Sequence, residues 1–203
     1  MRTKRGLYFI YLVFVSCIIM MGIQYYFVHA SIPSNVHNGY LSGSYGPQNK
    51  SEWCWVASAE NACKCEGYHY HDQYYTVNVM KGTMTDPCPN VTGSIGDSAS
   101  AVGIISTNCL SYTGVNSAKS FAFIAELIYY NHPVIAAGGY YDEHGNRNGG
   151  HAVLIIGWSD ATGTDEISYY DSLNSGSYHT CTYSSFCDGS YNTRIYDQSA
   201  YHI

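Results

Sequence analysis

A cysteine at the start of a predicted helix is the feature of the sequence best suited to chemistry. Cys54 lies where a polar loop gives way to the Ala-rich run Val56-Ala57-Ser58-Ala59, which is typical of a helix. A helix N-terminus carries unpaired backbone N–H groups and the positive end of the helix dipole, and both favour a thiolate. We therefore interpret Cys54 as a nucleophile. A cysteine buried in a core helix for structural reasons is the alternative.

A glutamine upstream of Cys54 can complete an oxyanion site. The side-chain NH2 of Gln48 and the backbone N–H of Cys54 can both donate to the oxygen of an attacked carbonyl group. Two such donors stabilise the charge that develops in acyl transfer. Glu52 does not fit this pattern, because an acid so close to Cys54 favours the helix N-terminus but disfavours a thiolate.

A cysteine nucleophile also needs a base, and the base needs an orienting group. His151 follows Gly149-Gly150 at the start of an apolar segment, where no bulky neighbour blocks its approach to Cys54. Asp171 ends the next apolar segment and is the candidate for the orienting group, with Asn174 and Asp160 in reserve. These residue types predict a Cys-His-Asp triad.

The segments around these residues resemble the papain-like cysteine protease superfamily. The run Trp53-Cys54-Trp55-Val56-Ala57 is similar to short bacterial members, which include leader-processing and plant-pathogen effector peptidases. A Gly-His-Ala-Val opening at 150–153, an aliphatic strand and then an acidic residue match the second half of the pattern. Papain itself has an amide at the third position, whereas several bacterial relatives have Asp. The resemblance covers roughly residues 46 to 175.

The resemblance implies a fold and an activity. It implies an α+β papain-like fold, with an N-terminal helical half that carries Cys54 and a C-terminal antiparallel sheet or half-barrel that carries His151 and Asp171. It also implies a cysteine endopeptidase that hydrolyses peptides or proteins through this triad, with Gln48 as oxyanion donor and with no cofactor or metal. We expect a cleft between the two halves to hold the substrate.

Other functions use the same side chains. An acyl transferase of the transglutaminase or arylamine acetyltransferase kind would need the same four roles. A cell-wall amidase is a further alternative, although its usual Asp-Cys entry is absent because Trp53 precedes Cys54. A catalytically inactive papain-like binding module is the non-enzymatic alternative. Gly96-Asp97-Ser98 matches a serine-esterase motif by three letters, without supporting context.

Length and composition limit the partners. At 203 residues, with 46% hydrophobic and 12% charged residues, the chain suits one folded domain, and we expect a monomer. Its formal charge is −6, and it has no cluster of Lys and Arg in its folded part. We therefore expect no nucleic-acid partner and no binding to anionic membranes.

The beginning of the chain predicts export. Three basic residues in the first five precede an apolar run at 7–23, and the small residue Ala30 ends a plausible cleavage site. We expect residues 1–30 to be a signal peptide, residues 31–46 a short linker and residues 47–203 the peptidase domain, in a secreted protein. The alternative is an uncleaved anchor formed by residues 7–28, which would hold the domain on the outer face of the membrane.

The remaining cysteines favour an oxidising compartment. Six cysteines remain in the exported part besides Cys54, an even number that permits up to three disulfides. They are Cys63, Cys65, Cys88, Cys109, Cys181 and Cys187. The last two bracket a short turn and form the expected pair, while the other pairings stay open. A zinc site at Cys63-Lys64-Cys65 and a metal shared by His69 and His71 on a strand are less favoured alternatives.

The elements that would position the triad follow from the apolar pattern. Ser120 is a predicted N-cap for a helix over Phe121–Asn131, which Pro133 follows. Strands are predicted over Val134–Ala137, His151–Trp158 and Glu166–Ser172, the first two joined by a polar turn as a hairpin. We expect residues 176–203 to add the last strands.

Overall fold

The computed structural model describes residues 32–83, 87–191 and 193–202, and the part from Asn35 onward forms one compact unit. The expected signal peptide or anchor lies outside the described residues. None of the helices in the described part of the chain has the length and apolar character that a membrane span requires.

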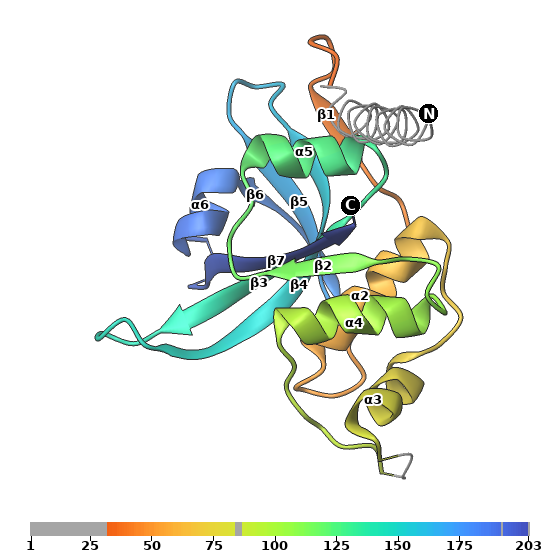
Figure 1. The fold of residues 1–203 in the computed structure, drawn as a ribbon. Coiled ribbons are helices and arrows are strands. Elements are labelled where there is room, and N and C mark those ends of the chain that lie inside the picture. The colour runs from red at the N-terminus through yellow and green to blue at the C-terminus, as the bar shows by residue number, and fades with distance from the viewer. Residues whose placement is uncertain (1–31, 84–86, 192, 203) are drawn as a thin grey trace, which may run out of the picture. The chain divides into compact units, whose positions relative to one another are not determined.

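The compact unit that begins at Asn35 is an α+β structure (Figure 1). Its helices are α2 (Cys54–Glu66), α3 (Gln73–Lys81), α4 (Ile95–Ile105), α5 (Phe121–Tyr129) and α6 (Tyr183–Asp188). Its strands are β1 (Asn38–Tyr40), β2 (Tyr112–Val115), β3 (Val134–Tyr141), β4 (Arg147–Ser159), β5 (Glu166–Asp171), β6 (Ser177–Thr182) and β7 (Ile195–His202). Helices thus dominate the first half of this unit and antiparallel strands the second, which confirms the predicted fold class.

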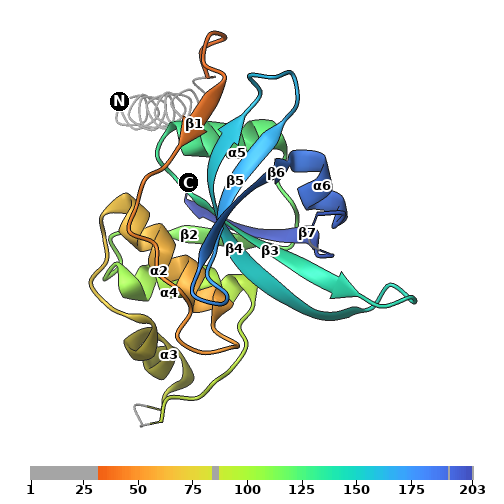
Figure 2. The same cartoon turned by 180° about the vertical axis from the view of Figure 1, so that it is seen from behind.

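Helices α2, α3 and α4 gather at one end of the sheet, and α5 and α6 lie at the other (Figures 1 and 2). Side chains fix where two of the first three begin. Asp72 accepts the N–H of Tyr75 and so caps α3, while Ser94 and Asp97 form a capping box at the start of α4. Gly67 follows the last residue of α2 and caps the helix, and its φ of 81° suits a residue without a side chain.

The strands form one antiparallel sheet in the order β2-β7-β3-β4-β5-β6, with β1 paired to the far end of β4. Leu154 of β4 lies opposite Tyr170 of β5. Because the two strands are antiparallel, the beginning of the buried part of β4 and the end of β5 lie at the same end of the two strands. The register therefore brings His151 and Asp171 together.

Strand β4 passes through the core. Its first four residues are exposed, and the run from His151 to Trp158 is buried. Helices α2 and α5 both contact this strand, which explains why its apolar run is continuous instead of alternating. The predicted hairpin is confirmed, but β4 begins at Arg147, inside the segment expected to be a turn.

Two segments differ from expectation. The stretch after residue 72, where no helix was predicted, forms helix α3 because Asp72 caps it and because Gln73, Thr76 and Val77 form a buried face. Residues 38–40, in the expected linker, form β1. Residues 176–203 add strands β6 and β7, as predicted, and β7 lies between β2 and β3.

The predicted disulfides are not found. Cys54, Cys63, Cys65 and Cys109 are free thiols, and so are both members of the expected pair, Cys181 and Cys187. Cys63 and Cys65 lie two residues apart on α2 and so face different directions. The thiol of Cys63 is buried and donates weakly to the carbonyl of Val102, at 3.6 Å, whereas Cys65 hydrogen-bonds Tyr45. Their geometry does not suit a shared zinc ion.

Candidate active site

Cys54 is the first residue of α2, as the sequence predicts. The helix leaves the N–H of its first residue without an intrahelical acceptor, so this group is available to a substrate oxygen. Trp53 and Trp55 flank the cysteine and are buried. Their indole N–H groups donate to the carbonyls of Pro89 and Val91, each at 3.1 Å. These two bonds hold the loop before α4 against the start of α2.

His151 and Asp171 form a buried pair next to Cys54. The Nε2 atom of His151 lies 2.6 Å from Oδ1 of Asp171. A hydrogen bond also joins the His151 side chain to that of Cys54. Since Nε2 faces the carboxylate, Nδ1 is the ring nitrogen left for the thiol. The three predicted residues therefore lie in one row, in the order acid, imidazole, sulfur.

Charge in this row favours an imidazolium. Burial alone would lower the pKa of His151, but its hydrogen bonds to Asp171 and Cys54 and the charges of both groups raise that pKa from 6.5 to about 9. Burial has the opposite effect on an acid and alone would raise the pKa of Asp171. The hydrogen bond from His151, the N–H of Leu173 and the charge of Arg194 lower this pKa. At neutral pH the pair is an ionised carboxylate and a protonated imidazole.

Gln48 lies on the loop that precedes α2 and is tied to the end of β5. Its backbone N–H donates to the carbonyl of Ser172 at 2.9 Å, and the Ser172 hydroxyl donates to Gln48 Oε1 at 3.3 Å. Both hydrogens of its side-chain NH2 are directed at the carbonyls of Lys50 and Ser51, at 2.9 and 2.7 Å. The structure thus brings the Gln48 loop to the triad, but the amide donates within its own loop.

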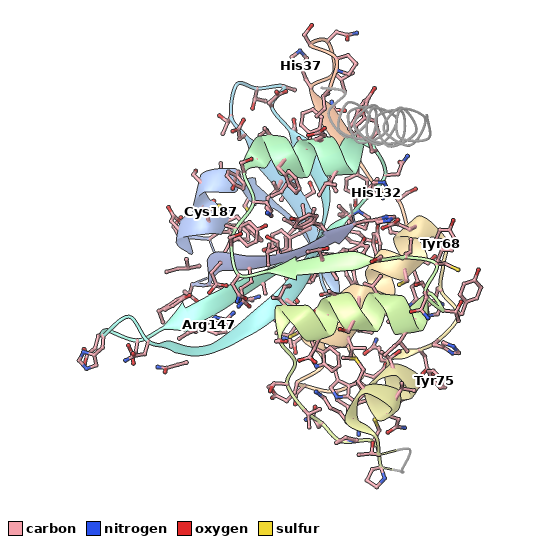
Figure 3. All side chains as sticks on the ribbon, in the orientation of Figure 1. His37, Tyr68, Tyr75, His132, Arg147 and Cys187 are labelled. Atoms are coloured by element: carbon pink, nitrogen blue, oxygen red, sulfur yellow. The ribbon has the colours of Figure 1, made fainter. Side chains whose placement is uncertain are left out.

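A cavity of about 280 Å³ borders the triad. The first turn of α2 and the first turn of α4 form one wall, and the β3–β4 hairpin and β7 form the other. Its lining includes Cys54, His151, Gly149 and Gly150, and also the exposed Glu52, but not Gln48. Both glycines line the cavity beside the thiol. Arg147, labelled in Figure 3, is the first residue of β4 and pairs with Tyr141 of β3 next to the turn of this hairpin.

Several residues that support the site were not predicted. A guanidinium nitrogen of Arg194 lies 3.6 Å from Asp171 Oδ2. Gln73, which is buried, donates to Glu60 Oε2 at 2.8 Å and to the carbonyl of Pro47 at 3.0 Å, and it accepts the N–H of Asn49 at 3.0 Å. This amide joins α2 to both neighbours of Gln48. The available signal was Glu60, an acidic residue inside the Ala-rich part of the helix, because a buried carboxylate requires partners.

Among the described residues, one group of three His, Cys, Asp or Glu side chains has ligand atoms close enough together to share a metal ion. It consists of Glu66, His132 and His202, and it lies away from Cys54. His69 instead bonds Glu60, at 2.9 Å, and His71 stacks on a tyrosine ring. The two histidines suggested as a metal pair from the sequence therefore have separate partners.

Comparisons with known proteins agree with this geometry. Residues 40–199 match the profile described as Peptidase_C39 like family. A Bacillus anthracis protein described as a C39-like peptidase is 12% identical, with a TM-score of 0.56, over 83% of this chain and 98% of that one. The digestive procathepsin L 3 of the Tenebrio molitor larval midgut is 13% identical, with a TM-score of 0.55, over 86% of this chain and 73% of that one.

The curated protein sequences give no significant match to this chain. At such low identities the two solved structures show a shared fold, while the profile match covers most of the chain. The chain belongs to the Peptidase_C39 like family, and it is a cysteine peptidase with a papain-like fold.

Proposed function

We propose that the protein is an endopeptidase that works outside the cytoplasm through Cys54, His151 and Asp171. The observation that carries this proposal is the row of side chains in which His151 bonds Asp171 at 2.6 Å and also bonds Cys54. The proposed location rests on the basic and apolar N-terminal sequence. The substrate is a peptide segment that enters the cavity beside the thiol.

The row supports a two-step reaction. The thiolate of Cys54 attacks the peptide carbonyl and forms a C–S bond, while the carbonyl electrons move onto oxygen. His151 then gives its proton to the leaving amine as the C–N bond breaks. Water, deprotonated by His151, attacks the resulting thioester, and the free acid leaves with the Cys54 thiolate restored. Asp171 keeps the imidazole oriented throughout.

The oxyanion receives two donors in this proposal. One is the N–H of Cys54, which α2 leaves free of an intrahelical acceptor. The other is Gln48, whose NH2 group exchanges one of its two present carbonyl partners for the substrate oxygen. That exchange costs little, because a neutral hydrogen bond is replaced by one to a charged oxygen, which is the stronger kind.

Hydrolysis of a mixed peptide library tests the function. The full chain is incubated under mild reductant beside its Cys54→Ala variant, and the products are identified by mass spectrometry. We expect internal cleavage by the parent protein and none by the variant. Cleavage by both proteins would contradict the assignment of the nucleophile.

A thiol-reactive epoxide separates the alternative activities. If the parent protein cleaves nothing but takes the epoxide at Cys54, an acyl transferase that needs an amine acceptor becomes the better account. If it neither cleaves nor reacts with the epoxide, the domain is an inactive papain-like module.

A further inference from the structure

A second cluster of histidines and a carboxylate lies at the far end of the catalytic helix. Glu66 is the last residue of α2, His132 lies in the turn between α5 and β3, and His202 is in the last position of β7. Figure 3 shows His132 near the end of β7. None of these residues contributes to the cleft around Cys54.

Three ligand atoms of this cluster converge. His132 Nδ1 and His202 Nδ1 lie 3.2 and 3.3 Å from the same oxygen, Glu66 Oε2, and 3.3 Å from each other. The atoms therefore form a nearly equilateral triangle. Around a tetrahedral ion with bonds of about 2.0 to 2.1 Å, neighbouring ligand atoms lie about 3.3 to 3.4 Å apart. The observed edges match the face of such a tetrahedron.

Hydrogen bonding alone explains this triangle poorly. If neither Nδ1 atom carries a proton, their lone pairs face each other at 3.3 Å, and if both do, two N–H groups crowd onto one oxygen. If only one does, the lone pair of the other faces the carboxylate oxygen. A cation in contact with all three atoms would satisfy every lone pair at once.

The surroundings resemble those of a metal ligand set. The hydroxyl of Tyr112 donates to Glu66 Oε1 at 2.6 Å, which leaves Oε2 as the single ligand oxygen, and the Tyr112 ring stacks on His202. Such partners orient the ligands of metal sites. A cavity of about 420 Å³, lined by Glu66, His132 and Cys65 among others, adjoins the cluster and leaves room for water as a fourth ligand.

We propose that Glu66, His132 and His202 bind a divalent transition-metal ion, preferably zinc, and that this ion ties the end of α2 to β7 and to the turn before β3. Two imidazoles and one carboxylate select zinc and its neighbours over magnesium and calcium. The site would brace the helical half against the sheet. It does not depend on the peptidase reaction.

Zinc titration of the full chain tests the proposal. The titration uses the metal-free Cys54→Ala variant, so that zinc cannot bind the catalytic thiol and His151. We expect one equivalent of zinc to bind and the thermal midpoint to rise with zinc concentration, because the ion binds the folded state. Cobalt, titrated in the same way, should give the intense visible absorption of a four-coordinate ion without a thiolate charge-transfer band.

Variants locate the site. In the same background, His132→Ala or His202→Ala should weaken zinc binding by more than about 100-fold, and Tyr112→Phe, which keeps every ligand, by about 10- to 100-fold. His69→Ala is the matched control, because His69 pairs with a single carboxylate, Glu60, and should leave binding unchanged. Tyr112→Phe also keeps the test decisive if an alanine variant fails to fold.

Three results would overturn the proposal. The first is the absence of stoichiometric zinc binding by the Cys54→Ala protein. The second is binding that survives both His132→Ala and His202→Ala. The third is a cobalt spectrum with a thiolate band that both His132→Ala and His202→Ala leave unchanged, which would place the ion on cysteines elsewhere in the chain.

Discussion

The two ends of helix α2 carry the same kinds of side chain in different arrangements. At its first residue, Cys54 meets a histidine that is bonded to a carboxylate. At its last residue, Glu66 meets two histidines. Each cluster joins the helix to the sheet, so one element of 13 residues fixes both positions.

The arrangement of partners separates the two clusters. In the cleft, each nitrogen of His151 has its own partner, and the row ends at a nucleophile, which suits proton transfer. At the other end, two imidazole nitrogens and one carboxylate oxygen converge on the same space, which suits a cation. The comparison teaches that residue types alone do not define a function, because the directions of the ring nitrogens decide between a base and a ligand.

The largest expected effect comes from the base itself. His151→Ala should lower kcat by about 10³-fold or more, because the thiolate loses its ion-pair partner and the amine its acid. His144→Ala, an exposed histidine on the β3–β4 turn, is the matched control and should keep full activity. Peptide hydrolysis measures both variants. Equal activity of the two would remove His151 from the mechanism.

Gln48→Ala should have the next largest effect. Loss of one oxyanion donor typically lowers kcat by about 10²- to 10³-fold, with a smaller change in KM. Labelling of Cys54 by a small alkyl halide, which forms no oxyanion, serves as the control and should keep its rate. A parallel loss of labelling would mean that Gln48 acts by shaping the loop.

Asp171→Asn separates charge from orientation in the catalytic row. The amide can still accept the His151 N–H, but it lacks the charge that helps to raise the pKa of His151 to about 9. The alkaline limb of the kcat/KM profile, expected near pH 9 in the parent, should therefore move towards the ordinary value of 6.5. A limb that stays in place would show that Asp171 is not the source of the shift.

The raised pKa of His151 also predicts how the free energy of unfolding depends on pH. Because this pKa is raised in the folded state, the contribution of His151 to stability is full below pH 6.5 and is lost as the pH rises through about 9. Unfolding by urea across this window should show the loss in the parent protein, and a smaller one in Asp171→Asn. A stability that rises over this window would contradict the assigned charge state.

The buried hydrogen bond from Gln73 to Glu60 attaches the middle of α2 to α3. Gln73→Leu would leave Glu60 and two backbone groups near Gln48 without their partner, and unfolding free energy should fall by about 2 kcal/mol or more. The exposed Asn116→Ala should change it by less than about 0.5 kcal/mol. Chemical denaturation measures both variants, and similar midpoints would argue against a buried network.

The catalytic row was predictable because each of its residues has a local signature. Cys54 stands at a change from loop to helix, His151 follows two glycines at the start of an apolar strand, and Asp171 ends the next strand. Short-range patterns locate all three, and the antiparallel register then brings the last two together. Gln48 was proposed on the same grounds, but the direction of its amide depends on loop carbonyls that no pattern reveals.

The second cluster could not be predicted, because only the tertiary fold assembles it. Glu66, His132 and His202 come from three distant segments without a common spacing, and His202 arrives there because β7 inserts between β2 and β3. Helix α3 was missed for a different reason. Its tyrosines and valines favour a strand locally, while the Asp72 cap and burial against the neighbouring helices favour a helix.

The most direct test of the central claim is the rate at which each thiol reacts. Cys54 is half-buried and Cys109 is exposed, so access alone predicts that Cys109 reacts faster. We predict the reverse at neutral pH: an alkylating reagent, followed by peptide mapping, should label Cys54 first, and His151→Ala should remove this preference. Labelling of Cys109 ahead of Cys54 in the parent protein would contradict an activated Cys54–His151 pair.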